Sequence, residues 1–247
     1  MASPVKLYQR EMHDNLGFFA NWLPGDPIAI GDAGVLEAGR FRRVASLAEL
    51  KIPFKVSRAG ATQDVQYTST HGTRLATSAG ATAAVLAQAE ITIEFSRAGA
   101  FVFHASGLRP HRIANRSEIA EKLVDAYAKK RWSEDWLLVE ALHVAERATI
   151  VVSEDKSAQV VLMANLTGVA PVVSLVDPRI GLTVASTRGK VVHIVGASRV
   201  RPLYSCLRLK DPLLRAPSVQ PVRGSLPDDA SAGAAFSRPA IDDLLSS

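Results

Sequence analysis

The chain of 247 residues contains a single cysteine, Cys206, and no long uninterrupted apolar run. One cysteine excludes an intrachain disulfide, which suits a reducing compartment. No window reaches the ~18–20 consecutive apolar residues that a membrane-spanning helix needs. Charged residues near the amino terminus interrupt any apolar segment of the kind found in secretory signal peptides. The sequence therefore predicts a chain that is made in the cytoplasm.

Motifs of the common enzyme and metal-binding classes are also missing. The sequence has no phosphate-binding loop, no dinucleotide fingerprint and no G-x-S-x-G nucleophile elbow. Its 6 histidines include no H-x-x-x-H pair, and Cys206 has no cysteine partner. No zinc-finger, helix-turn-helix or RNP signature accompanies the basic residues. We therefore expect no enzymatic activity, no catalytic residue, no metal site, no cofactor and no nucleic-acid partner.

The overall composition is that of a globular protein. Hydrophobic residues make up 47% of the chain and charged residues 21%, so a sizeable core can be buried. The formal net charge of +5 fits an anionic partner such as an acidic membrane surface. On charge alone, a solvated basic surface is the simpler explanation.

The order of apolar patterns along the chain predicts the fold class. Helical spacing covers residues 4–23 and 116–131, whereas strand-like patterns cover 28–41, 136–152 and several segments between 159 and 209. Helix, strands, helix and strands in this order predict an α+β fold with a twisted, mostly antiparallel sheet and flanking helices. Proline, serine and alanine become frequent after Lys210, so we expect a domain over 1–210 and a tail over 211–247.

The segment over residues 75–106 is the most informative part of the chain. Residues 75–89 carry no charge, residues 90–95 alternate polar and apolar side chains, and Arg97-Ala98-Gly99 favours a turn before a second apolar run. Strand alternation predicts a hairpin with one apolar face, formed by Ile91, Ile93, Phe95, Phe101 and Phe103.

Two interpretations of such a hairpin remain open. An amphipathic strand pair can cover the core of a water-soluble α+β domain that acts as a binding or scaffold module with a disordered tail. It can also place its apolar face in lipid and its polar face in a water-filled lumen.

Three stretches, taken in order, resemble the pore-forming domain of bacterial gasdermins. The first comprises the turn Gly31-Asp32, the run Arg40-Phe41-Arg42-Arg43 and Ser46-Leu47-Ala48-Glu49-Leu50. The second is Trp136-Leu137-Leu138-Val139-Glu140-Ala141-Leu142, and the third spans residues 190–209. The chain departs from the family in one respect, because residues 1–20 contain no cysteine for lipidation.

The resemblance implies a latent pore-forming effector of cell death in antiviral defence. It implies a cytoplasmic monomer held inactive by its carboxy-terminal peptide, which an activating protease removes. The freed domains would then oligomerise into a β-barrel pore in the inner membrane. Here the tail would dock through Ile241, Leu244 and Leu245, and the protease would cut after Arg215 or Arg223 in the exposed linker.

Basic residues in the first part of the chain are the expected lipid contacts. Each is worth about 1 kcal/mol near an anionic membrane surface. The expected contacts are Lys6, Arg10, Arg40, Arg42 and Arg43.

Overall fold

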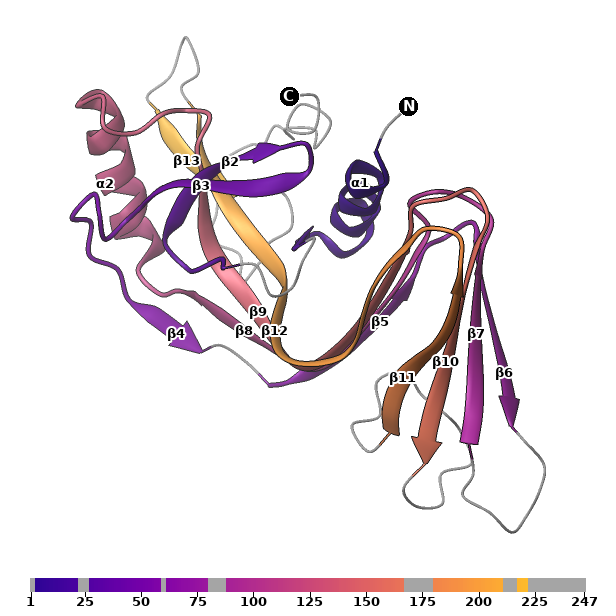
Figure 1. The fold of residues 1–247 in the computed structure, drawn as a ribbon. Coiled ribbons are helices and arrows are strands. Elements are labelled where there is room, and N and C mark those ends of the chain that lie inside the picture. The colour runs from indigo at the N-terminus through magenta and orange to yellow at the C-terminus, as the bar shows by residue number, and fades with distance from the viewer. Residues whose placement is uncertain are drawn as a thin grey trace. The chain divides into compact units, whose positions relative to one another are not determined.

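The computed structural model describes residues 3–21, 27–58, 61–79, 88–166, 180–210 and 217–221. These residues form the helices α1 (Pro4–Leu16) and α2 (Arg116–Ala128) together with two sheets (Figure 1). The strand pairs described are antiparallel. The α+β class with a mostly antiparallel sheet is therefore confirmed.

The strands follow one another along the chain with few helices between them. They are β1 (Phe19–Ala20), β2 (Asp32–Glu37), β3 (Arg40–Ser46), β4 (Val56–Arg58), β5 (Gln63–Thr68), β6 (Thr73–Ala79), β7 (Gln88–Phe95), β8 (Phe101–Ile113), β9 (Leu137–Ser153), β10 (Ala158–Leu166), β11 (Ile180–Arg188), β12 (Val191–Lys210) and β13 (Ser218–Pro221).

Helix α1 is shorter than the sequence predicts. The apolar spacing extends to Leu23, but the helix ends at Leu16. Gly17 adopts φ +76°, a left-handed conformation that glycine tolerates without strain, and its N–H closes the last turn on the His13 carbonyl at 2.9 Å. Phe19 and Ala20 then pair with β12 as strand β1. A sheet partner thus competes successfully with helix propagation beyond Gly17.

Helix α2 forms where the sequence predicts it, and Asn115 precedes its first turn. Asn115 makes no side-chain cap, because its Oδ1 accepts a hydrogen bond from the Lys55 N–H at 2.9 Å. Its Nδ2 instead donates to the Glu118 carboxylate at 2.8 Å. The buried face of α2 consists of Ile119, Leu123 and Ala126, at the spacing that one helical stripe requires.

The chain divides into two compact units. The first unit comprises residues 1–8, 61–108 and 144–200, and the second comprises 9–60, 109–143 and 201–247. The larger sheet has nine described strands in the order β1-β12-β9-β2-β3, with β8 paired to β9, β4 and β5, and with β13 paired to β12. The smaller sheet has the order β11-β10-β7-β6 and lies within the first unit.

The second unit has an apolar core on the strands that α2 covers. The α2 stripe packs with Leu47, Ile113, Leu138, Leu207 and Leu209. At the start of α2, Arg116 forms an ion pair with Glu140 of β9, whose side chain is fully buried. Another cluster of this unit contains Phe19, Leu36, Val139, Tyr204 and Cys206, so Cys206 is a buried free thiol.

The predicted hairpin over residues 88–106 is wrong in its pairing. Strand β7 pairs with β6 and β10, whereas β8, which carries Phe101 and Phe103, pairs with β4, β5 and β9 in the other sheet. The turn between β7 and β8 does not close a hairpin, because the Gly99 N–H donates to Ser153 O at 2.7 Å and the Ser153 N–H donates to Ala100 O at 2.8 Å. The strand after the turn, β8, therefore pairs with β9 and not with β7.

Phe101 and Phe103 are consequently core residues of the first unit. Both are fully buried. The Phe101 ring makes an edge contact with Tyr8 at 4.7 Å between centroids and a tilted contact with Tyr67 at 5.5 Å. The prediction that Phe101 and Phe103 share a face with Ile91, Ile93 and Phe95 is therefore wrong.

Candidate functional site

The four-stranded sheet of the first unit is built from two pairs of consecutive strands. β6 pairs with β7, β10 pairs with β11, and β7 joins the two pairs through β10. Residues directly opposite each other on antiparallel strands project to the same face. The register therefore assigns each side chain to one of two faces.

One face of this sheet is apolar. The register places Leu75, Ile93 and Val160 in one row, and Ile91, Leu162 and Val184 in another. Phe95, Ala158 and Leu182 lie on the same face, as do the uncharged polar residues Thr73 and Thr187. Apart from Leu75, these apolar side chains pack with Ala100, Val102, Val151, Val191 and Val195 of the same unit.

Burial on the apolar face falls toward the two edge strands. Ile93 and Val160 on the central strands are fully buried, whereas Leu75 on β6 is 42% exposed. Leu182 and Val184 on β11 are half-buried. The sheet thus carries apolar surface on its edge strands that its own unit covers only in part.

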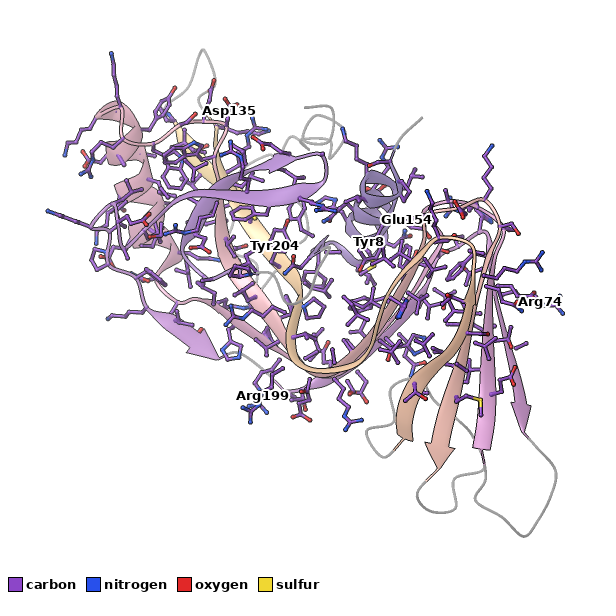
Figure 2. The ribbon with its side chains drawn as sticks, in the orientation of Figure 1. Tyr8, Arg74, Asp135, Glu154, Arg199 and Tyr204 are labelled. Atoms are coloured by element: carbon purple, nitrogen blue, oxygen red, sulfur yellow. The ribbon has the colours of Figure 1, made fainter. Side chains whose placement is uncertain are left out.

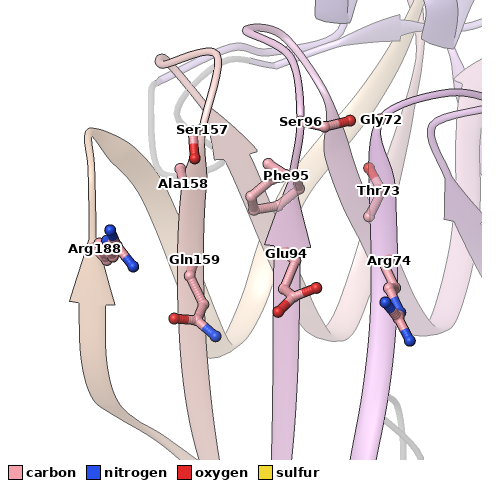
Figure 3. Close-up of a pocket in the computed structure, with 10 residues that line it drawn as sticks. All are labelled: Gly72, Thr73, Arg74, Glu94, Phe95, Ser96, Ser157, Ala158, Gln159 and Arg188. Carbon is pink, nitrogen blue, oxygen red and sulfur yellow. The ribbon is translucent and has the colours of Figure 1, made fainter.

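The opposite face is polar and contains every charged residue of the four strands. These residues are Arg74, Glu90, Glu94 and Arg188. Arg74, Glu94, Gln159 and Arg188 stand directly opposite one another in a single row across all four strands. Figure 3 shows this row, with one side chain projecting from each strand.

An open groove of about 510 Å³ follows the polar row. Its lining comprises Gly72, Thr73, Arg74, Glu94, Phe95, Ser96, Ser157, Ala158, Gln159 and Arg188 (Figure 3). Gly72 has φ +84°, and a side chain there would meet the Arg97 Cγ at 2.6 Å. Arg97 Nε donates to the His71 carbonyl at 2.8 Å, which fixes the turn that leads into β6.

The sequence identifies part of this sheet and misses the rest. Ile91, Ile93 and Phe95 lie on one apolar face, as their alternation predicts. In β10, Gln159, Val161 and Met163 are only half-buried, because they lie on the polar face. The pattern around Leu182 and Val184 predicts a strand, but the sequence does not indicate which strand it pairs with. Arg74 and Arg188 are missed because only the register brings them into one row.

The predicted lipid-contacting arginines of β3 lie in the second unit, and two of them, Arg42 and Arg43, are engaged in ion pairs. Arg42 donates to Glu37 through two hydrogen bonds of 2.7 Å. Arg43 donates to Asp32 at 3.0 Å and to Glu49 at 2.6 Å. The hydrogen bonds from Arg42 and Arg43 lower the pKa of Glu37 and of Glu49.

A small pocket of about 50 Å³ brings two of the predicted basic residues together. Arg40 and Arg43 line it together with Gln9, Asn21, Phe41 and Tyr204. The Gln9 side chain fixes its wall, since its Nε2 donates to Gly39 O at 3.0 Å and its Oε1 accepts from the Ala20 N–H at 2.9 Å. The remaining two predicted contacts, Lys6 and Arg10, both lie on α1.

Most of the predicted tail lies outside the described residues. Arg215, Arg223, Ile241, Leu244 and Leu245 all belong to that part. The described piece is β13, which pairs with residues 207–210 of β12. Val219 of β13 is half-buried against the cluster that contains α2.

Within the described ranges, no group of three or more His, Cys, Asp or Glu side chains is arranged to hold a metal ion. Neither α1 nor α2 has the length and apolar character of a membrane-spanning helix.

Comparisons with known proteins identify a distant structural neighbour. No protein-family profile matches the chain, and neither does any curated protein. Among solved structures, the chain is similar to the gasdermin A3 membrane pore determined by cryo-electron microscopy, with 8% sequence identity over 73% of each chain and a TM-score of 0.27. A TM-score this low does not support a shared fold or function. The function therefore has to be inferred from the chain's own strands.

Proposed function

We propose that this chain is a latent, non-enzymatic, gasdermin-like pore-forming protein whose four-stranded sheet enters a membrane when several copies assemble. The observation that carries the proposal is the segregation of charge in β6, β7, β10 and β11. Their charged residues share the polar face with Gln159, and the other face has none among the described residues. A barrel wall needs this arrangement, with apolar side chains in lipid and polar side chains in the lumen.

The length of the strands fits a membrane. β10 and β11 have 9 residues each, β7 has 8 and β6 has 7. A strand that crosses the hydrocarbon region needs about 9–11 residues when it is tilted. The described strands therefore reach close to the required span.

The edges of the sheet explain why one copy is insufficient. β6 and β11 each have a neighbour on one side only among the described strands. Unpaired backbone groups in lipid cost several kcal/mol each, so a sheet enters a membrane only as a closed barrel. Because β6 and β11 run in opposite directions, β11 of one copy can pair with β6 of the next in an antiparallel joint. Repetition of this joint closes a ring.

The proposal includes an activation step. The apolar face is packed against β8, β9 and β12 of its own unit, so the sheet has to be released before it meets lipid. We propose that proteolysis after Arg215 or Arg223 removes the tail and permits this release. The protein would be cytoplasmic before cleavage and would kill the cell from the inner membrane afterwards, as an antiviral defence. Anionic lipid would be held by Lys6, Arg10, Arg40, Arg42 and Arg43.

The test uses the full-length chain with a recognition site for a specific protease introduced after Arg215. Cleavage is expected to release dye from vesicles of anionic phospholipid, whereas the uncut chain leaves them sealed. Two neighbouring substitutions on β11 separate the faces: Val184→Arg on the apolar face and Thr183→Arg on the polar face. An arginine at mid-membrane depth on the lipid face costs about 2–4 kcal/mol, so Val184→Arg should suppress leakage and Thr183→Arg should retain it.

Circular dichroism and thermal unfolding of both variants distinguish lost insertion from lost folding. Equal leakage from Val184→Arg and Thr183→Arg would contradict a lipid-facing sheet. Sealed vesicles with the cleaved, folded wild type would contradict pore formation itself.

One observation favours a second candidate, a water-soluble binding or scaffold domain. Ile93 and Val160 are fully buried against the first unit's own strands, as in an ordinary core. Sealed vesicles in every arm of the test would support this alternative.

A further inference from the structure

The polar row of the four-stranded sheet has a positively charged residue at each end, one on each edge strand. Arg74 stands on β6 and Arg188 on β11, with Glu94 and Gln159 between them. Both arginines are exposed, and neither forms an ion pair with a described residue. The Arg74 side chain extends from the edge of the sheet in Figure 2, and both arginines appear at opposite ends of the row in Figure 3.

Assembly of neighbouring copies would bring these two charges together. In an antiparallel joint between β11 and β6, the straight register places Arg188 of one copy directly opposite Arg74 of the next. Directly opposite Cβ atoms lie about 4.5–5.5 Å apart, and diagonal neighbours about 7–8 Å. A stagger of two residues, of the kind a tilted barrel needs, still leaves the pair within reach of two long side chains.

The row leaves one of the two arginines without compensation. Arg74 has Glu94 as its neighbour within the same copy, whereas Arg188 has the neutral Gln159. Each joint would thus hold one surplus positive charge beside a second guanidinium. Like charges opposite each other weaken strand pairing. Two guanidinium groups at this spacing match the oxygen atoms of a phosphate group, which they bind through paired charged hydrogen bonds.

We propose that the joint between copies is a phosphate site formed by Arg188 of one copy and Arg74 of the next, and that assembly is slow until phosphate fills it. The proposal rests on the proposed function. Without an anion, the arginines keep the open sheet edges of separate copies apart, as charged residues do on edge strands. The phosphate group comes from a phospholipid headgroup or from dissolved phosphate.

The experiment measures oligomer formation of the full-length chain after cleavage at the introduced protease site. Crosslinking followed by electrophoresis reports the oligomer, and dye release reports the pore. Neutral vesicles with inorganic pyrophosphate form one arm, and anionic phospholipid vesicles without it form another. A third arm contains neutral vesicles in chloride at matched ionic strength, because salt alone screens the arginines.

Arg188→Glu is the decisive variant, since it would pair with Arg74 of the next copy without an anion. Its matched control is Lys156→Glu, which makes the same charge change in an exposed turn of the same unit. Wild type and Lys156→Glu should assemble about tenfold faster with pyrophosphate or anionic lipid than in chloride, the low end of what one charged hydrogen bond supplies. Arg188→Glu should assemble at the fast rate in all three arms.

The outcomes separate the inference from the function on which it rests. Stimulation of wild type by anionic vesicles alone identifies the headgroup as the source, and stimulation by pyrophosphate identifies dissolved phosphate. Equal assembly of wild type and Arg188→Glu in every arm overturns the phosphate joint and leaves pore formation intact. An equal response of Arg188→Glu to phosphate also overturns it. Failure of every cleaved, folded variant to assemble or release dye overturns the proposed function together with the inference.

Discussion

Arg116 at the start of α2 forms an ion pair with Glu140 of β9, whose side chain is fully buried. Burial raises the pKa of Glu140, while the nearby guanidinium groups of Arg116 and Arg112 oppose that rise. The carboxylate is therefore held in the core of the second unit by cations from α2 and β8. This pair ties the helix to the sheet.

Removal of one partner should destabilise the protein more than removal of both. Arg116→Met leaves Glu140 buried without its ion-pair partner, and we expect the free energy of unfolding to fall by about 3 kcal/mol. The double variant Arg116→Met, Glu140→Leu should recover most of that loss, because no buried charge remains. Urea unfolding measures both, with Arg42→Met of the exposed Arg42–Glu37 pair as the control.

The defect of Arg116→Met should also shrink on acidification. In this variant, the pKa of Glu140 in the folded protein should lie further above the ordinary value, because the Arg116 cation no longer opposes the effect of burial. The carboxyl group therefore takes up a proton more readily in the folded protein than in the unfolded chain. The stability that protonation supplies is present at low pH and is lost as the pH rises through the folded-state pKa. A defect that grows as the pH falls would contradict a buried Glu140 carboxylate that lacks its ion-pair partner.

Two buried histidines should make the wild type less stable in mild acid. Burial lowers the pKa of His104 to about 4, and burial together with Arg112 and His111 lowers that of His143 to about 4, from 6.5. The unfolded chain binds these protons first, so the free energy of unfolding should fall as the pH drops from about 6.5 to 4. Each histidine contributes up to about 3 kcal/mol.

Urea titrations over this pH range test the effect, with the variants His104→Gln and His143→Gln measured beside the wild type. Each variant should show a shallower decrease in stability than the wild type. An unchanged slope in both would show that other groups control the acid response.

Phe101 should behave as a core residue. It is fully buried between Tyr8 and Tyr67. Phe101→Ala should lower the free energy of unfolding by about 3–5 kcal/mol, because it removes an aromatic side chain from a packed site. Phe101→Leu, which keeps much of the volume, should lose less. A folded Phe101→Ala protein of wild-type stability would contradict a core position for Phe101.

Strand β13 should protect one edge of β12 from hydrogen exchange. It pairs with residues 207–210, while β1 pairs with Leu203 and Tyr204. Val219→Asp places a charge at a half-buried position and should release β13, with Val219→Thr as the milder control. Exchange should then accelerate at residues 207–210 and stay slow at Leu203 and Tyr204. Uniform acceleration would indicate global unfolding instead.

Local patterns predicted several elements and failed at others for identifiable reasons. The alternation of Ile91, Ile93 and Phe95 correctly indicated a strand with one apolar face, because side-chain period depends only on neighbouring residues. The same reasoning places Phe101 on that face, which is wrong. The turn sequence Arg97-Ala98-Gly99 is equally compatible with a hairpin and with a connection between two sheets. Backbone hydrogen bonds between Ser153 of β9 and the turn residues Gly99 and Ala100 determine that the turn connects two sheets.

The amino-acid sequence by itself determined the α+β class, the position of α2, the amphipathic character of β7 and the scarcity of recognisable catalytic motifs. The tertiary structure alone decided which strands became neighbours, and hence that Arg74, Glu94, Gln159 and Arg188 form one row. The reason is that the period of a strand fixes which face a residue occupies, whereas pairing depends on hydrogen bonds and packing between segments far apart in the chain.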